Sequence, residues 1–339
     1  MTDVTLDPTK RGYWTSDQEV RWCPGCGDYG ILAAMQFLHT DLDVKREDTV
    51  FVSGIGCAAR FPYYMSTYGL HSIHGRAPAI ATGLALARPD LHIWVVGGDG
   101  DMLSIGGNHL IHALRRNVNL KILMFNNQIY GLTKGQYSPT SEVGKVTKST
   151  PMGSIDTPFN TLSVAAGAGA TFIARTHDLD RTHMMDVFRR AHEHKGAAFV
   201  EIYQNCNVFN DGAFDAIIKR DARAEKMIDL VHGQPIRFGA DNQRGIVFEH
   251  GVARAVEVAD VGEAAIAVHD AHNPNPSLAF ALAQLSNDRV SPTPFGVFRE
   301  VQTQEYAEAV TNQLLAANEK NGPGDLAALL RSGATWEVE

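Results

Sequence analysis

Four short apolar runs, each bounded by turn-forming residues, decide which class of fold this chain can adopt. They are continuous rather than alternating in polarity, as expected for strands that are covered on both faces of a sheet. Helical patterns at 29–39, at 77–88 and around 103–114 separate them. Alternating strands and helices predict an α/β fold with a mostly parallel sheet and helices on both faces. The expected strands are 50–52, 93–96, 122–125 and 198–203.

The periodicity weakens after about residue 210. Helical patterns remain at 278–285 and 306–315, and we expect loops at 273–276 and 291–294. We therefore predict a chemical domain at residues 1–210 and a C-terminal extension at 211–339. The extension is expected to serve subunit contacts or to cover the site.

Composition excludes two classes of partner. The 339 residues include 30 basic and 38 acidic side chains, a formal charge of −8, which argues against non-specific binding of nucleic acid. No run approaches the roughly 18 apolar residues of a membrane-spanning helix. The polar N-terminus lacks the pattern of a signal peptide. These features predict a soluble, cytoplasmic chain that binds neither nucleic acid nor membrane.

Polar, glycine-rich segments follow two neighbouring strands of the predicted sheet. Residues 97–101 (GGDGD) follow one strand and residues 126–131 (NNQIYG) follow the next, with one helix between them. The carboxyl ends of parallel strands form the edge where α/β sheets bind ligands. Glycines there let backbone amides approach a phosphate, and carboxylate, amide and carbonyl oxygens suit Mg²⁺.

This pattern resembles the thiamine diphosphate motif, in which GDG and NN are separated by a spacer of about this length. The resemblance implies that Asp99, Asn127 and the Ile129 carbonyl bind Mg²⁺. It further implies that the diphosphate is lined by Gly98, Gly100 and Asp101. Two ordinary loop turns are the plain alternative. A dinucleotide site is disfavoured because no G-x-G-x-x-G precedes a suitably placed acidic residue.

The chain has four cysteines, Cys23, Cys26, Cys57 and Cys206, all next to turn-forming or polar residues. Disulfides are not expected in a cytoplasmic protein, because that compartment keeps thiols reduced. Four thiolates suit either a tetrahedral zinc ion or an iron–sulfur cluster. Counting thiolates does not separate these two alternatives.

Five sequence blocks, in this order, closely resemble the β subunit of 2-oxoacid:ferredoxin oxidoreductases over about residues 15–240. The blocks are CPGCG at 23–27, GIGC at 54–57, HSIHGR at 71–76, the motif at 98–127, and Cys206. The resemblance implies one [4Fe-4S] cluster, held by the four cysteines beside thiamine diphosphate. It therefore favours an iron–sulfur cluster over zinc.

The same resemblance implies further cofactor contacts. His74 is a candidate for contact with the cofactor or the substrate, and so for a catalytic role; a structural histidine near Arg76 is the alternative. The remaining residues expected to line the cofactor are Ile55, Gly56, Cys57, Ala58, Gly131 and Leu132.

Lys134 bears on the choice of substrate. The pattern of Leu132 and Lys134 resembles the branch that uses 2-oxoglutarate or a broad range of 2-oxoacids, whereas pyruvate-selective relatives tend to carry an Asn-Thr-Gly type of sequence here. The lysine could pair with a distal carboxylate, which pyruvate lacks; a solvated loop lysine is the alternative. We expect 2-oxoglutarate, coenzyme A and oxidised ferredoxin to give succinyl-CoA, CO₂ and reduced ferredoxin, or the reverse.

Other functions stay open at this point. They are oxidation of pyruvate or of a broad range of 2-oxoacids, a non-oxidative thiamine enzyme, and a zinc-stabilised assembly subunit without activity. The non-oxidative reaction is disfavoured because it needs no electron acceptor and so does not account for the cysteines.

The family resemblance also implies partners. Thiamine enzymes activate the cofactor with a glutamate from a separate pyrimidine domain, which this family places on an α subunit. We expect a heterodimer, doubled to a dimer of heterodimers, in which this chain is inactive alone. The chain lacks a ferredoxin-like C-x2-C-x2-C-x3-C run, so electrons are expected to leave to a separate ferredoxin.

Overall fold

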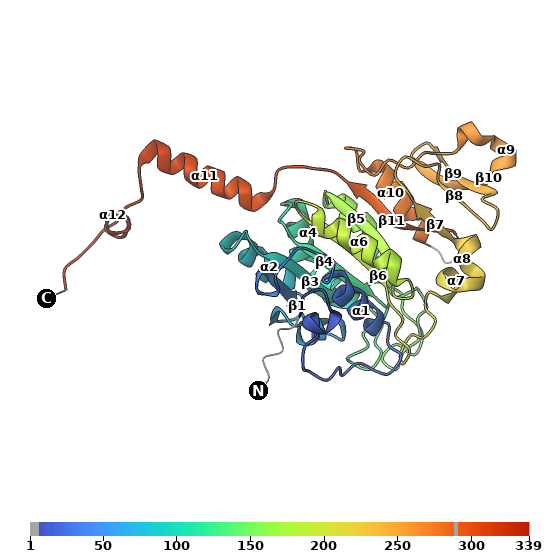
Figure 1. Ribbon diagram of the computed structural model, residues 1–339, viewed down its shortest axis with the longest axis horizontal. Coiled ribbons are helices and arrows are strands. Elements are labelled where there is room, and N and C mark those ends of the chain that lie inside the picture. Colours follow the sequence, from blue (N-terminus) through green and yellow to red (C-terminus); the bar gives the residue numbers. More distant parts are fainter. Residues whose placement is uncertain (1–6, 288–290, 339) are drawn as a thin grey trace.

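A computed structural model describes residues 7–287 and 291–338, which are organised around one eight-stranded sheet (Figure 1). The strand order is β2-β1-β3-β4-β6-β5-β11-β7, and every neighbouring pair is parallel except β11 with β5. The expected mostly parallel α/β sheet is therefore confirmed. The strands are β1 Thr49–Ser53, β2 Tyr68–His71, β3 His92–Gly98, β4 Lys121–Asn126, β5 Phe172–His177, β6 Ala198–Tyr203, β7 Met227–Leu230 and β11 Thr293–Glu300.

Helices cover both faces of this sheet, and each face has its own apolar core. One core joins alternate strand residues such as Val50 and Val52 to α2 Ala77–Ala87, α4 Gly107–Arg115, α5 Thr161–Gly167 and α10 Ser277–Gln284. The other core joins Phe51 and its neighbours to α1 Asp28–Leu38 and α6 Arg181–Glu193. Burial on both faces explains why the strand sequences are continuous apolar runs.

The helix expected around 103–114 is two helices. The first, α3, spans Asp99–Leu103, and α4 begins at Gly107. A Cβ at Gly106 would lie 2.3 Å from the Asp101 carbonyl oxygen, and one at Gly75 would lie 2.6 Å from the Gly106 nitrogen. The break therefore lets the loop around Gly75 approach α3 closely.

The C-terminal part contributes to the main sheet and also forms a smaller one. β7 and β11 join the eight-stranded sheet, and β11 begins at Thr293, inside the segment expected to be a loop. The small antiparallel sheet consists of β8 Arg237–Phe238, β9 Arg244–Glu249 and β10 Val252–Glu257. A boundary at residue 210 stays a prediction, and the main sheet runs across that position.

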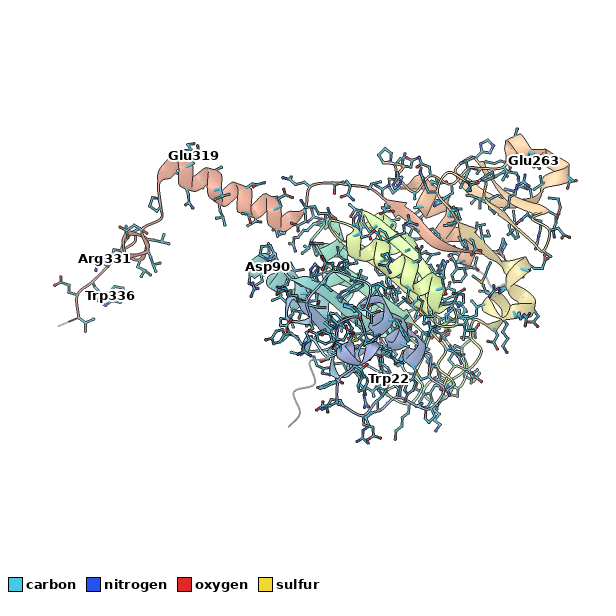
Figure 2. The ribbon with its side chains drawn as sticks, in the orientation of Figure 1. Trp22, Asp90, Glu263, Glu319, Arg331 and Trp336 are labelled. Atoms are coloured by element: carbon cyan, nitrogen blue, oxygen red, sulfur yellow. The ribbon has the colours of Figure 1, made fainter. Side chains whose placement is uncertain are left out.

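A helical arm ends the described chain. It consists of α11 Tyr306–Asn321 and α12 Leu326–Leu330, and it extends away from the body in Figures 1 and 2. Its side chains from residue 311 onward are exposed, including Trp336. The remaining helices are α7 Asp215–Ile218, α8 Arg220–Lys226, α9 Val258–Val261 and the 3₁₀ turns Arg11–Trp14, Arg46–Asp48, Ala58–Tyr64, Glu263–Ala265 and Leu285–Asn287.

Across residues 7–287 and 291–338, no helix combines the length and the apolar character needed to cross a bilayer.

A buried ion pair ties the centre of the sheet together. Arg175 on β5 donates to Glu201 on β6 at 2.7 Å, and each side chain is only 2% exposed. Asn126 at the end of β4 donates to the second oxygen of Glu201, also at 2.7 Å. Arg175 further donates to the Pro294 carbonyl of β11 at 3.3 Å. One charged pair therefore connects four strands.

We expect Glu201→Ala to lower the free energy of unfolding by about 3–5 kcal/mol, because it leaves the Arg175 guanidinium buried without its counter-charge. Thermal or urea unfolding of the purified protein measures this loss. The double variant Arg175→Met/Glu201→Leu is the matched control and should recover most of the stability. A double variant as unstable as the single one would contradict the electrostatic explanation.

Candidate functional site

A cavity of about 330 Å³ opens at the carboxyl ends of β1, β3 and β4. Ser53 pairs with Val96 and Gly98 with Phe125, so the loops that follow these strands start at neighbouring points. The cavity brings together all the residues expected to line the cofactor. These are Ile55, Gly56, Cys57, Ala58, His74, Gly98, Asp99, Gly100, Asp101, Asn127, Ile129, Gly131 and Leu132, joined by Tyr130 and Thr133.

Asp99 is a buried carboxylate at the start of α3. Its Oδ2 accepts hydrogen bonds from Ser138 Oγ at 2.6 Å and Thr140 Oγ1 at 2.5 Å. Burial raises the pKa of Asp99 to about 6, and the two hydroxyls only partly oppose the shift. Both hydroxyls are uncharged, so a divalent cation in this cavity would supply the missing counter-charge. The residue therefore fits the expected magnesium ligand.

Asn127 and Ile129 belong to one tight turn after β4. Gln128 between them has a φ of 56°, and its N–H donates to Asn126 Oδ1 at 3.2 Å. The Ile129 N–H donates to Asn127 Oδ1 at 3.2 Å. This turn places the Asn127 side chain and Ile129 at the same cavity as Asp99. Oxygen donors from one carboxylate, one amide and one carbonyl form a hard donor set of the kind that Mg²⁺ prefers.

Gly100 gives the cavity a flat wall. A Cβ at this position would lie 2.1 Å from Tyr130 Cε1, so the tyrosine ring packs directly on the glycine. The Tyr130 hydroxyl donates to the Gly100 carbonyl at 3.1 Å. Sequence reasoning did not single out Tyr130. Its signal was its place inside the NNQIYG segment, three residues after Asn127.

Asp101 joins three segments around the cavity. Its Oδ1 accepts hydrogen bonds from His74 Nδ1 at 2.6 Å, from the Gly75 N–H at 2.7 Å and from the Ile55 N–H at 3.1 Å. Burial raises the pKa of Asp101, and these donors oppose the shift. Because Nδ1 of His74 donates to the carboxylate, Nε2 of a neutral ring is left as an acceptor. His74 borders the cavity and is thus held in one orientation.

Cys57 lines this cavity, and Cys26 and Cys206 lie near it. The sulfur atoms of Cys57 and Cys206 lie 3.7 Å and 3.5 Å from the position of a Cβ on Gly131. The Cys26 sulfur accepts a hydrogen bond from Gln204 Nε2 at 3.3 Å, and the Cys26 N–H donates to the Cys23 carbonyl at 3.0 Å. Thus the chain folds the 23–26 turn toward the loops that carry the other two cysteines.

Burial favours the neutral thiol form of two of the cysteines. Burial raises the pKa of the Cys57 thiol to about 11 and also raises the pKa of Cys26. Iron–sulfur chemistry would supply the charge that stabilises these groups as thiolates. Within the described residues, no three His, Cys, Asp or Glu side chains are arranged to hold a single metal ion.

Comparison with known proteins identifies the family. The model of the thiamine pyrophosphate enzyme C-terminal TPP-binding domain matches residues 54–202. The chain is 56% identical to 2-oxoglutarate oxidoreductase subunit KorB of Mycobacterium tuberculosis, over 99% of this chain and 90% of that one. This chain belongs to the β subunits of the 2-oxoacid:ferredoxin oxidoreductases.

Two further relatives agree with this assignment. The β subunit of 2-oxoacid:ferredoxin oxidoreductase 1 of Aeropyrum pernix is 45% identical over 56% of this chain and 60% of its own length. A solved structure of the 2-oxoglutarate:ferredoxin oxidoreductase of Magnetococcus marinus, with 2-oxoglutarate, coenzyme A and succinyl-CoA bound, superposes with a TM-score of 0.76. It is 29% identical and covers 98% of both chains. The thiamine-binding α/β fold of this β subunit is thereby confirmed.

A second cavity of this β subunit adjoins the first. It measures about 440 Å³ and shares Ile55, Gly56 and Leu132 with the first cavity. It is lined by Arg60 and by Arg21, and Arg21 forms an ion pair with Glu19 of the same lining at 2.9 Å. Lys134, by contrast, is exposed in a turn with a φ of 71°, and it lines neither cavity.

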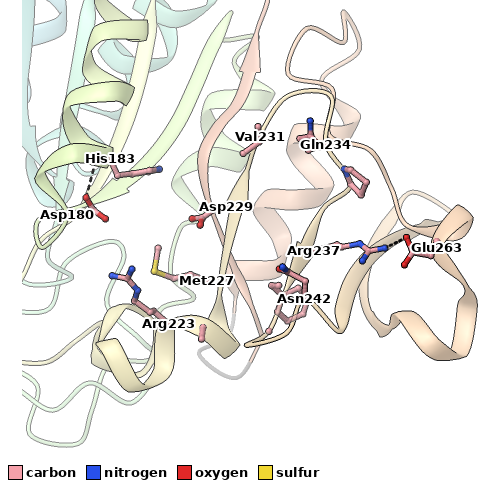
Figure 3. A pocket seen from close by; sticks show the side chains of 14 residues that line it. Asp180, His183, Arg223, Met227, Asp229, Val231, Gln234, Arg237, Asn242 and Glu263 are labelled. Carbon is pink, nitrogen blue, oxygen red and sulfur yellow. Dashed lines mark hydrogen bonds and ion pairs between the residues drawn. The ribbon is translucent and has the colours of Figure 1, made fainter.

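Another cavity, of about 640 Å³, lies between α6 and the small sheet (Figure 3). It contains the ion pair of Arg237 with Glu263, and the N-cap Asp180, which accepts from the His183 N–H at 3.0 Å. It shares no lining residue with the cavities at the carboxyl edge of β1, β3 and β4. Its position gives it no part in the candidate cofactor site.

We expect Asp99→Ala to weaken Mg²⁺-dependent binding of thiamine diphosphate by about 100-fold, because a buried charged contact is lost. Equilibrium dialysis of the purified protein with Mg²⁺ and the cofactor measures the effect. Asp90→Ala, which removes an exposed aspartate, is the matched control and should bind like the wild type. Retained affinity in Asp99→Ala would contradict the metal assignment.

Proposed function

We propose that this chain is the β subunit of a coenzyme A-dependent enzyme that oxidises 2-oxoglutarate to succinyl-CoA and CO₂ and reduces ferredoxin. It would carry thiamine diphosphate, Mg²⁺ and one [4Fe-4S] cluster. One observation carries the proposal: Cys57, a candidate cluster ligand, also lines the candidate thiamine cavity. The sulfurs of Cys57 and Cys206 both lie within 4 Å of the position of a Cβ on Gly131, which lines the same cavity. The names of the Mycobacterium tuberculosis and Magnetococcus marinus proteins support the choice of 2-oxoglutarate.

One group of residues would bind thiamine diphosphate and its cation, and the cysteines would bind the cluster. Thiamine diphosphate, when bound, supplies the electron sink for loss of CO₂ from a 2-oxoacid. Asp99, Asn127 and the Ile129 carbonyl would hold the cation that binds its diphosphate. His74, oriented by Asp101, would present Nε2 toward the bound molecules. Oxidative decarboxylation releases two electrons, and Cys23, Cys26, Cys57 and Cys206 would hold the cluster that passes them on singly to ferredoxin.

Positive charge near the cavity supports a dicarboxylic substrate. Lys134 lies two residues after Leu132, which lines both adjoining cavities, and Arg60 lines the second of them beside the ion pair of Arg21 with Glu19. A distal carboxylate could pair with Lys134 or Arg60, and pyruvate has no such carboxylate. Oxidation of pyruvate or of a broad range of 2-oxoacids is the alternative. The reverse reaction, reductive carboxylation, needs the same site with reduced ferredoxin.

The enzyme would require an α subunit for the glutamate that activates the cofactor, in a heterodimer or a dimer of heterodimers. The part of the chain from 211 to 339 would serve subunit contacts or cover the site. Apolar side chains of the helical arm, such as Leu314, Leu315 and Leu330, are exposed and available for such contacts. We place the complex in the cytoplasm, where the cysteines would stay reduced.

The function is tested with the αβ complex purified without oxygen, in a coenzyme A-dependent assay of viologen reduction. We expect turnover of 2-oxoglutarate and much slower turnover of pyruvate. Activity on pyruvate alone would keep the family and overturn the substrate.

Lys134→Ala tests the substrate argument in the same assay. Loss of an exposed ion pair of about 1 kcal/mol corresponds to a drop of roughly five-fold in kcat/KM for 2-oxoglutarate, with little change for pyruvate. Arg60→Ala probes the adjoining cavity for comparison. If Lys134→Ala lowers kcat/KM equally for 2-oxoglutarate and pyruvate, the lysine does not bind the distal carboxylate.

Cys206→Ser tests the cluster assignment. We expect the variant to lose iron, because serine replaces one of the thiolate ligands, while Mg²⁺-dependent binding of thiamine diphosphate is largely retained. Iron and sulfide analysis, together with the absorbance of the anaerobically purified αβ complex, measures the loss. If the variant keeps the full iron content of the wild type, Cys206 is not a ligand.

A further inference from the structure

Gln204 is a buried amide that lies between the two candidate centres. It directly follows β6 and is 1% exposed. Its Oε1 accepts a hydrogen bond from Asn127 Nδ2 at 2.8 Å. Its Nε2 donates to the Cys26 sulfur at 3.3 Å and to the Asn205 carbonyl at 2.5 Å. One side chain therefore contacts a proposed magnesium ligand and a proposed cluster ligand.

The direction of these hydrogen bonds follows from the neighbouring groups. Asn127 Oδ1 accepts from the Ile129 N–H, so the amide nitrogen of Asn127 must face Gln204. The oxygen of Gln204 must then receive that donor. Its nitrogen is left facing a carbonyl oxygen and a sulfur, both of which are acceptors. The chain of donors therefore runs from Asn127 through Gln204 to Cys26, and flipping either amide would break it.

The backbone around Gln204 holds it in this position. The Gln204 N–H donates to the Asn126 carbonyl at 3.0 Å, next to Asn127. The Asn205 carbonyl, which Gln204 also contacts, accepts the Gly27 N–H at 3.1 Å, next to Cys26. Both ends of the side-chain bridge are thus fixed by main-chain hydrogen bonds to the same two segments.

We propose that Gln204 is a positioning residue that couples the thiamine and iron–sulfur sites: it orients the Asn127 side chain and hydrogen-bonds the Cys26 sulfur. This inference rests on the proposed function, because it requires both cofactors. Nothing in the spacing of the motifs assigns a role to this residue.

Two measurable properties depend on such a bridge. An N–H donated to a cluster thiolate stabilises the more negative, reduced cluster and so raises its reduction potential. The acceptor that Gln204 offers to Asn127 keeps the side-chain oxygen of Asn127 turned to the metal position, which favours binding of the cofactor. A side chain that merely filled space would affect neither property.

Two substitutions separate the two ends of the bridge. Gln204→Glu keeps an oxygen for Asn127 but replaces the N–H that faces Cys26. Gln204→Met has similar length and removes all three side-chain hydrogen bonds, to Asn127, Cys26 and the Asn205 carbonyl. Gln36→Met is the matched control, because Gln36 is an equally buried amide bonded to Arg11 and to the Tyr64 carbonyl, away from both sites.

The experiment uses the αβ complex, purified without oxygen. The reduction potential of the cluster is measured by redox titration with electron paramagnetic resonance. The dissociation constant of thiamine diphosphate is measured by equilibrium dialysis with Mg²⁺. Both readouts are independent of turnover.

We expect Gln204→Glu to lower the reduction potential and to keep the dissociation constant near that of the wild type. Gln204→Met should lower the potential and also raise the dissociation constant about five-fold, the effect of one lost hydrogen bond. Gln36→Met should change neither quantity. If Gln204→Glu assembles no cluster, Gln204→Met alone decides the potential.

An unchanged potential in cluster-containing Gln204 variants, or an equal change in Gln36→Met, would overturn the coupling role. That outcome leaves the proposed function intact. A wild-type complex without iron and without an iron–sulfur signal would instead overturn the cluster assignment itself, so the two failures are distinguishable.

Discussion

Parallel strands end at the same edge of a sheet, and the chemistry of this chain depends on that constraint. β1, β3, β4 and β6 are consecutive in the sheet, so the four loops that follow them lie side by side. Those loops carry the candidate thiamine ligands and two of the cysteines. Cys57 follows β1 and Cys206 follows β6, and the sulfurs of both lie near Gly131 in the turn after β4. The proximity of the two proposed cofactor sites is thus a consequence of strand order.

Several buried polar groups at this edge have partners from other segments of the chain. Asp101 accepts three donors from the loops at 55 and at 74–75. Asp99 is held by hydroxyls from the loop at 138–140. Glu201 binds Asn126, which in turn supports the turn that contains Asn127. A buried polar group without a partner is costly, so moving any of these loops alone would break several contacts.

The sequence predicted the central part of this architecture well, because continuous apolar strands and short motifs are local signals. It did not predict β5, whose residues Arg175, Thr176 and His177 are polar although they are buried. Arg175 is tolerated there only because Glu201, on the neighbouring strand, neutralises it. The sequence also did not predict β11, because Pro294 and Gly296 interrupt the apolar pattern of that strand. β11 pairs antiparallel with β5, which lies far from it in the sequence.

The cofactor-lining residues followed from motifs, whereas their supporting residues did not. Ser138 and Thr140 lie in a polar loop that resembles any surface loop, and Gln204 touches Asn127 and Cys26 only after folding. Such partners come from distant parts of the chain, and spacing along the sequence carries no record of them.

Gly131 shows how closely the two sites can approach. The sulfurs of Cys57 and Cys206 both lie within 4 Å of the point where its Cβ would be. A Cβ there would be in van der Waals contact with both sulfurs. Cys57 itself lines the candidate thiamine cavity. An electron leaving a substrate-derived group in that cavity would therefore have a short path to a cluster held by these cysteines, and Gln204 bridges the same two sites through hydrogen bonds.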